Sequence, residues 1–331
     1  MSAELTFPDQ VVSAASNTKR QPALVRVTAL MCTLLAVSGA TLLTILVKTG
    51  LEPRVDEFGR FVLLAVLMLF LAGWCQKRFT DQRLTHAALA FAAATLFLML
   101  AGLIANTGLR LQMPIADAGL AAADAALGLD MAAVVRLTAE TSWLTGPLKF
   151  AYNWSTLAVA LLILGWLALG QHARAWELIL TAFFCLQAAA IISVFFPAKG
   201  TAFFFDLGHL QGNGIPEGAA VYAGATFDWF YFGTQTVVGL DTLNGVVTFP
   251  SFHTVLALLA TQALWPTKLK WPAIIWTAAV IVSTIPMGGH YAVDLAGGVL
   301  LWVAGCALAQ WAVGSGQLEA ATRSSAITHN P

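Results

Sequence analysis

Long apolar runs dominate this sequence and limit what it can fold into. Of the 331 residues, 58% are hydrophobic and only 10% are charged, whereas about a quarter of the residues in a soluble domain carry a charge. So few charges cannot cover a water-facing surface, and runs of about 20 apolar residues match the thickness of a bilayer. The sequence therefore predicts an all-α fold, a polytopic membrane helix bundle.

Eight apolar runs are candidate transmembrane helices. They occupy residues 24–47, 61–75, 84–105, 150–170, 176–196, 249–265, 271–286 and 291–313. Several are shorter than the roughly 20 residues of a full crossing. When both termini are placed in the cytoplasm, Lys and Arg concentrate in the inner segments, as the positive-inside rule requires. We therefore expect a multi-pass protein of the inner (cytoplasmic) membrane with eight spans.

The same pattern divides the chain into four parts. We expect a cytoplasmic tail over 1–23, two accessory transmembrane helices over 24–83, a six-helix catalytic core over 84–313 and a C-terminal tail over 314–331. The Ala-rich stretch 115–135 carries Asp117, Asp124 and Asp130, which are about seven residues apart. It predicts an amphipathic helix at the outer interface or a re-entrant cap, and an ordinary connecting helix fits equally well. Residues 198–248 form a long outer loop, a kind of segment that often carries function.

Charge and cysteine content exclude some partners and assign no chemistry. The 17 basic residues balance the 17 acidic ones, which gives no support for a nucleic-acid partner, because such partners call for a basic surface. The four cysteines lack paired spacing and lie in or beside apolar runs, so we interpret them as small buried hydrophobes. The sequence leaves the oligomeric state open.

Three ionisable side chains stand at the mouths of apolar helices. His253 follows Pro250 and Ser251 at the start of one run, and His290 follows Gly288 and Gly289 at the start of another. Asp294 lies four residues after His290, which places the two side chains on one helix face. In the eight-span topology both histidines lie at the outer side. Ionisable groups at membrane depth are costly, so this cluster is a functional hypothesis by default.

Two histidines and an aspartate have the parts for phosphoryl transfer. One neutral imidazole attacks phosphorus, and a carboxylate on its other nitrogen fixes the tautomer. The second histidine gives the leaving oxygen a proton. Helix N-termini add N–H groups and a positive dipole for the phosphate, and Gly288–Gly289 lets the backbone approach closely.

These motifs resemble those of the type 2 phosphatidic acid phosphatase superfamily. Pro250–His253 resembles its second motif, Pro-Ser-Gly-His, and the stretch from Ser283 to Asp294 resembles its third, Ser-Arg-x5-His-x3-Asp. The resemblance implies that His290 is the nucleophile, Asp294 its partner and His253 the proton donor. Phe252 in place of Gly, and the wording His-Tyr-x-x-Asp, look closest to the branch with inositol phosphorylceramide synthases and sphingomyelin synthases, which transfer phospho-headgroups between lipids.

The phosphate-binding groups depart from that pattern. Thr284 stands where the third motif has Arg, and the first motif, Lys-x6-Arg-Pro, is absent as such. Lys199, at the exit of the fifth run, is a candidate phosphate-binding cation, and an interfacial lysine that snorkels to water is the alternative. Ser251 is a candidate phosphate ligand and helix cap, two roles that are compatible. Gly289 completes the predicted substrate-binding set.

Other functions remain open at this point. A zinc site would use the two histidines and Asp294, but no further ligand is evident and no metal or other cofactor is expected. Bis-histidine haem would need histidines inside facing helices. A lipid or headgroup transporter would use the same cluster for binding, although no inverted repeat is visible. We expect a lipid phosphatase or phosphotransferase that acts on a lipid phosphoester at the outer face through a phosphohistidine.

Overall fold

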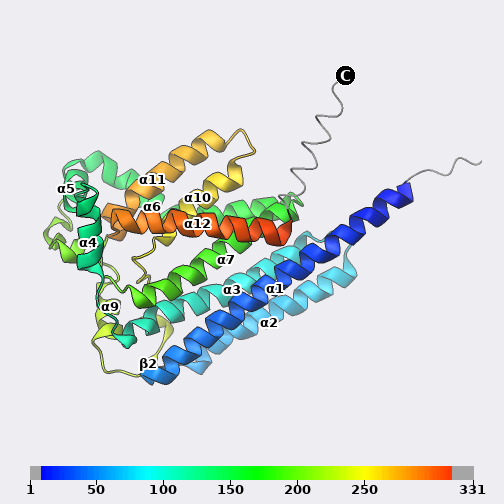
Figure 1. The fold of residues 1–331 in the computed structure, drawn as a ribbon, viewed down its shortest axis with the longest axis horizontal. Coiled ribbons are helices and arrows are strands. Elements are labelled where there is room, and N and C mark those ends of the chain that lie inside the picture. The colour runs from blue at the N-terminus through cyan, green and yellow to red at the C-terminus, as the bar shows by residue number, and fades with distance from the viewer. Residues whose placement is uncertain (1–8, 315–331) are drawn as a thin grey trace, which may run out of the picture.

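The computed structural model describes residues 9–314, with side chains from residue 25 onward. Twelve α-helices lie in this part of the chain (Figure 1). They are α1 (Asp9–Thr49), α2 (Val55–Arg78), α3 (Arg83–Gly108), α4 (Asp117–Ala126), α5 (Met131–Glu140), α6 (Ser142–Ala168), α7 (His172–Phe195), α8 (Thr201–Phe204), α9 (Gly224–Tyr231), α10 (Phe252–Leu264), α11 (Lys270–Gly288) and α12 (Ala292–Val313). The predicted all-α fold is confirmed.

Seven helices are long and apolar enough to cross a membrane. They are α1 from Val25 onward, α2, α3 with the 3₁₀ turn that follows it, α6, α7, α11 and α12. Each corresponds to one of the eight predicted runs. The chain is therefore a multi-pass membrane protein. Helix α1 begins at Asp9, so the predicted tail is already helical over 9–23, while 1–8 and 315–331 lie outside the described residues.

The predicted sixth span differs from the others. It is helical only over α10, whose 13 residues measure about 20 Å against a hydrocarbon core of roughly 30 Å. The run over 249–265 is therefore helical over most of its length but is too short to count among the membrane-spanning helices. Pro250 explains the late start, because proline disfavours the helical conformation in the residue before it and cannot donate a backbone hydrogen bond.

The helices form two groups that meet along α7 and α12 (Figure 1). Helices α1, α2 and α3 pack together on one side, and α6, α10 and α11 pack together on the other. Helix α7 contacts α3 as well as α10, and α12 contacts α1 as well as α10. The starts of α10 and α12 are therefore enclosed by helices from distant parts of the sequence.

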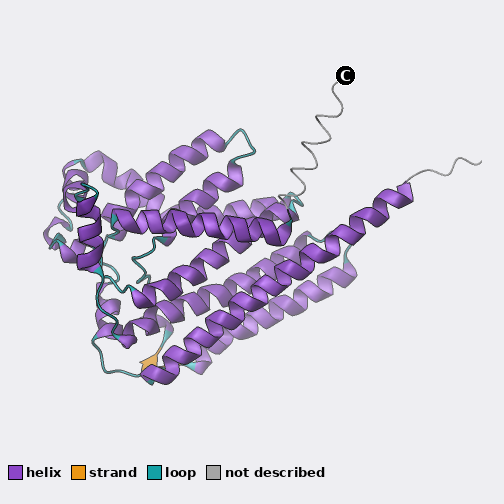
Figure 2. Cartoon of the chain, in the orientation of Figure 1, coloured by secondary structure: helices purple, strands orange, loops and turns teal. Residues whose placement is uncertain are grey.

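The loop over 198–248 is tied to the two N-terminal helices. Two short strands, β1 (Glu52–Pro53) and β2 (Val237–Val238), pair in parallel (Figure 2). The Glu57 carboxylate also accepts a hydrogen bond of 2.6 Å from the Leu240 N–H. The turn between α1 and α2 thus fixes one end of the loop that precedes α10.

The stretch 115–135 is two helices and not one. Helices α4 and α5 meet at 86°, and counting the pair as one broken span would give eight spans. Gly128, with φ of 74°, follows α4 in the left-handed conformation that commonly ends a helix. Asp130 caps α5 by accepting a hydrogen bond of 2.9 Å from the Ala133 N–H. One continuous amphipathic helix, the first of the expected alternatives, is therefore not what forms here, whereas a bent pair of helices fits the expected re-entrant cap.

Candidate active site

His290 and Asp294 form a buried pair at the start of α12. The His290 side chain lies in the short link between α11 and α12, with Nδ1 3.2 Å from Asp294 Oδ2. The same oxygen accepts a hydrogen bond of 2.8 Å from the Tyr291 N–H. His290 is 2% exposed and Asp294 is fully buried. A proton on Nδ1 therefore faces the carboxylate, which leaves the Nε2 lone pair directed away from it.

The start of α10 meets this pair from the other side. Ser251 is the N-cap of α10, and its Oγ lies 3.4 Å from His290 Nε2 and 3.4 Å from the Thr254 N–H nitrogen. Its own N–H donates a 2.9 Å hydrogen bond to the Asp294 carbonyl. Gly298 permits this approach, because a Cβ at that position would collide with the Ser251 carbonyl oxygen. Two motifs that are separate in sequence are thus bonded to one another.

His253 stands beside His290 and stacks on an aromatic ring of α6. The rings of His253 and His290 have centroids 6.3 Å apart. The His253 ring is half-buried and lies 4.0 Å from the Tyr152 ring, with 15° between the planes. The Tyr152 hydroxyl is 3.0 Å from that of Tyr222. This stacking fixes the plane of the imidazole. Among the described contacts its ring nitrogens make no hydrogen bond, which leaves them available for a proton.

Gly288 is the glycine on which this close approach depends. A Cβ there would lie 2.9 Å from both His290 Cδ2 and the Tyr152 hydroxyl oxygen. Gly289 has a different place: with φ of 74° it caps α11, and its N–H donates to Ile285. Its carbonyl accepts from the Thr201 N–H at 2.8 Å. Because both polar groups of Gly289 are bonded within the protein, the structure gives it the role of forming the turn.

Lys199 is near the cluster but its ammonium is already paired. It forms an ion pair with Asp228 of α9, and three phenylalanine rings, Phe203, Phe227 and Phe232, lie within 5.4–5.9 Å of its Nζ. A cavity of about 20 Å³, lined by Lys199, Tyr222, Gly288 and neighbouring residues, has room for one water molecule. Lys199 therefore lines a small cavity that reaches Gly288, and the residues that line this cavity do not include His290, Ser251 or His253.

Thr284, which occupies the place of an arginine in the third motif, supplies no cation. Its side chain is buried and donates a hydrogen bond of 2.7 Å to the Ile281 carbonyl of its own helix. Within residues 25–314, no group of three His, Cys, Asp or Glu side chains is arranged to hold a metal ion.

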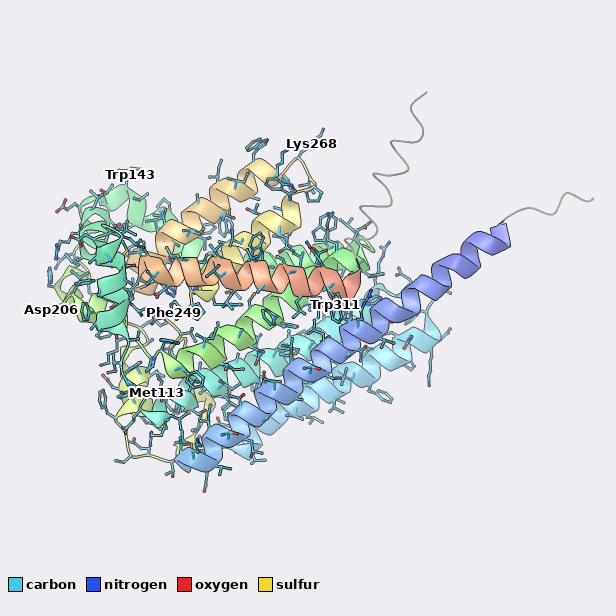
Figure 3. The ribbon with its side chains drawn as sticks, viewed as in Figure 1. Met113, Trp143, Asp206, Phe249, Lys268 and Trp311 are labelled. Atoms are coloured by element: carbon cyan, nitrogen blue, oxygen red, sulfur yellow. The ribbon has the colours of Figure 1, made fainter. Side chains whose placement is uncertain are left out.

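The site lies at one end of the helix bundle. Figure 3 labels Phe249, just before α10, towards the end that also holds Asp206 of the long loop, whereas Lys268 and Trp311 lie towards the opposite end. Helices α4, α5 and α9 cover the end with the site (Figure 1). As predicted, His253 and His290 therefore lie together at the same end of the helix bundle.

The family follows from the sequence that builds this site. The family model described as the PAP2 superfamily matches residues 118–308, which is more than half of the chain and includes both histidines and Asp294. The chain belongs to the PAP2 superfamily. Comparisons with curated proteins and with solved structures gave no match. Membership supports a phosphatase-type function on phosphoesters at a membrane.

The PAP2 match begins within α4 and ends within α12. It includes α5 and nearly all of α4, which form the stretch predicted as an amphipathic helix, a re-entrant cap or a connecting helix. It does not include α3, which was predicted to be the first helix of the catalytic core. The predicted limits of that core, 84–313, therefore stay a prediction.

Four side chains that were not predicted lie around the candidate site. Asp117 accepts hydrogen bonds from the Lys199 and Gly200 N–H groups, at 2.9 and 2.8 Å, and from the Tyr291 hydroxyl at 2.8 Å. Asp124 accepts from the first two N–H groups of α12. Tyr291, whose hydroxyl donates to Asp117, is the third, and Tyr152, described above, is the fourth. The spacing of Asp117 and Asp124 was noted in the sequence, but neither was assigned to the site, whereas in the structure they are 5% and 2% exposed and contact its segments.

Proposed function

We propose that this protein is a lipid phosphatase or phosphotransferase that works through a phosphohistidine on His290. The observation that carries the proposal is the position of His290 between Asp294 and Ser251. The Asp294 carboxylate accepts a hydrogen bond from the Nδ1–H of His290, and Nε2 of His290 faces the Ser251 hydroxyl 3.4 Å away. A phosphate held at Ser251 would thus meet the free lone pair of the nucleophile.

The first step forms one bond and breaks one bond. His290 Nε2 attacks phosphorus, the bond from phosphorus to the lipid oxygen breaks, and His253 donates a proton to that oxygen. Asp294 accepts the Nδ1 hydrogen bond and stabilises the charge that develops on the ring. The separation of 6.3 Å between the two ring centroids places the proton donor next to the nucleophile.

The second step decides between hydrolysis and transfer. Water or a lipid alcohol attacks the phosphohistidine, His253 accepts the proton of the attacking hydroxyl, and the bond from phosphorus to nitrogen breaks. The two motifs of this chain resemble those of the branch with inositol phosphorylceramide synthases and sphingomyelin synthases, and this resemblance supports transfer of a phospho-headgroup. The acceptor in that reading is a lipid alcohol such as a ceramide or a diacylglycerol.

The site would act on a phospholipid or sphingolipid-type phosphoester at the outer face of the inner membrane. Support comes from the Lys and Arg distribution and from the position of the cluster at one end of the bundle (Figure 3). The acyl chains would stay among the apolar helix surfaces, and the phosphate would enter beside Lys199. Because the adjoining cavity is only about 20 Å³, binding would move the Lys199 side chain from Asp228 towards the phosphate.

One experiment tests the chemistry. Purified protein is incubated with headgroup-labelled phospholipids in bicelles, with and without ceramide or diacylglycerol, and free and lipid-bound label are separated. Wild-type protein should release or transfer label, and His290→Ala should lose at least about 10³-fold in rate, as nucleophile removal does in other enzymes. His209→Ala is the matched control, because His209 is exposed on the loop. Full activity of His290→Ala would eliminate the phosphohistidine.

A further inference from the structure

Two carboxylates on one face of α4 contact the segments that carry His290, Asp294 and Lys199. Asp117 and Asp124 are seven residues apart, which is two helical turns and therefore the same face. Both side chains are buried, and between them they accept five hydrogen bonds from outside their own helix. Buried carboxylates are costly unless they are bonded in this way, so their contacts are the reason for their position.

Asp117 connects the lysine segment to the histidine segment. Its Oδ2 accepts from the Lys199 N–H and its Oδ1 accepts from the Gly200 N–H and the Tyr291 hydroxyl. Tyr291 follows His290 directly in the chain. Burial, with the adjacent Asp117 carboxylate, raises the pKa of Tyr291, so its hydroxyl stays a donor. One carboxylate thus holds the backbone at Lys199 and the side chain of Tyr291, the residue next to His290.

Asp124 holds the first turn of α12. Its two oxygens accept from the Ala292 and Val293 N–H groups at 2.8 and 2.9 Å. These are among the four amides that an α-helix leaves without an intrahelical partner, and a carboxylate is favoured there by the helix dipole. Asp294 lies in the same turn, so this contact fixes the height and rotation of the residue that orients His290.

We propose that Asp117 and Asp124 are positioning residues for the reaction at His290, an inference that rests on the proposed function. Neither carboxylate touches the reacting atoms. Asp117 sets the distance between the Lys199 segment and the nucleophile, and Asp124 sets the rotation of α12 that brings Asp294 to His290 Nδ1. The acidic face of α4 is therefore part of the active site and not a solvated surface.

The test compares Asp117→Asn, Asp124→Asn and Asp130→Asn in the full-length protein. Asn keeps the size of the side chain but turns one acceptor into a donor that opposes the backbone N–H groups. For the first two variants we expect kcat to fall about 10–100-fold, as small misplacements of reacting groups do, with KM within about threefold. Asp130→Asn is the matched control, because Asp130 is exposed and caps α5 alone. It should stay within about twofold of wild type.

Amide hydrogen exchange separates positioning from loss of folding, independently of activity. Asp117→Asn should speed exchange at Lys199 and Gly200, and Asp124→Asn should speed it at Ala292 and Val293, each without affecting the other pair. Tyr291→Phe removes one donor to Asp117, so the double variant with Asp117→Asn should be no worse than Asp117→Asn alone. If Asp117→Asn yields no folded protein, Tyr291→Phe carries the test with an expected kcat loss of about threefold to tenfold.

Two results distinguish failure of this inference from failure of the proposed function. Folded Asp117→Asn, Asp124→Asn and Tyr291→Phe proteins with kcat within twofold of wild type would overturn the positioning role, even if His290→Ala is inactive. Activity that survives in His290→Ala would instead overturn the function, while the crossed exchange pattern would still report whether the two carboxylates hold their segments.

Discussion

The two helices that carry the site histidines begin in different ways. At α12, side-chain carboxylates of Asp294 and Asp124 accept from the Tyr291, Ala292 and Val293 N–H groups. At α10, among the described contacts, no carboxylate accepts from the first turn, and the Ser251 hydroxyl contacts the Thr254 N–H at 3.4 Å.

A helix start attracts anions through its free N–H groups and its dipole. The protein's own carboxylates fill that position at α12, so in the proposed mechanism α12 supports the nucleophile. The proposed position for a substrate phosphate is then the start of α10. Phosphate binding at both helix starts was the expectation from the sequence, and the proposal divides these roles between the two helices.

The largest effect should come from a substitution at the start of α12, at Asp294. Asp294→Asn removes the acceptor that holds the Nδ1 proton of His290, which favours the wrong tautomer, and a loss of about 10³–10⁴-fold in kcat is expected from equivalent changes in catalytic triads. The measurement is headgroup release at saturating lipid. Asp206→Asn, an exposed acid in the long loop, is the control, and a loss below tenfold for Asp294→Asn would contradict the pairing.

A substitution of His253, on α10, tests whether this residue gives a proton to the leaving group. His253→Asn keeps a polar side chain without a titrating nitrogen, so lipid esters, whose alkoxide leaves poorly, should lose about 10²–10⁴-fold in rate. An aryl phosphoester, whose leaving oxygen needs no proton, should lose about tenfold or less. Equal losses on both substrates would mean that His253 does not donate the proton. His290→Ala is the reference, because it should disable both reactions equally.

A smaller effect should locate the phosphate. Ser251→Ala removes one hydroxyl contact of about 1–1.5 kcal/mol, so inhibition by inorganic phosphate or vanadate should weaken about tenfold. Asp124→Asn should leave that inhibition unchanged within about twofold, because it acts on the occupied helix start. Ser283→Ala is the matched control, since the buried Ser283 hydroxyl bonds to its own helix carbonyl at 2.6 Å. Weakened inhibition in Asp124→Asn alone would reverse the division of roles.

Local patterns made much of this structure predictable. The spans follow from apolar runs, and the spacing of four residues correctly brought His290 to Asp294, although His290 lies in the link before α12 and not in the helix itself. The capping role of Ser251 is equally local, because a serine before an apolar helix bonds to an amide two or three residues later. For such features the sequence neighbours are also the spatial neighbours.

The remaining contacts join residues that are far apart in the chain. The bond between Tyr291 and Asp117 spans 174 positions, and the one between Ala292 and Asp124 spans 168. Their spacing on α4 was visible, but a buried acidic face has the same periodicity as a solvated one. Pairing of β1 with β2 was hidden for another reason, since strands of two residues leave no alternation to detect.

The smallest effect should come from a side chain of α10, and it tests whether the backbone N–H groups or the side-chain hydroxyl of the first turn bind phosphate. Thr254 has a buried hydroxyl with no hydrogen-bond partner in the described structure, while its N–H contacts Ser251. Thr254→Val keeps the shape and the amide, so kcat and inhibition by phosphate should change by less than about threefold, because no bond made by that hydroxyl is lost. A tenfold loss would show that the hydroxyl itself binds substrate, and the phosphate site would then extend from the helix start at Ser251 into the first turn of α10.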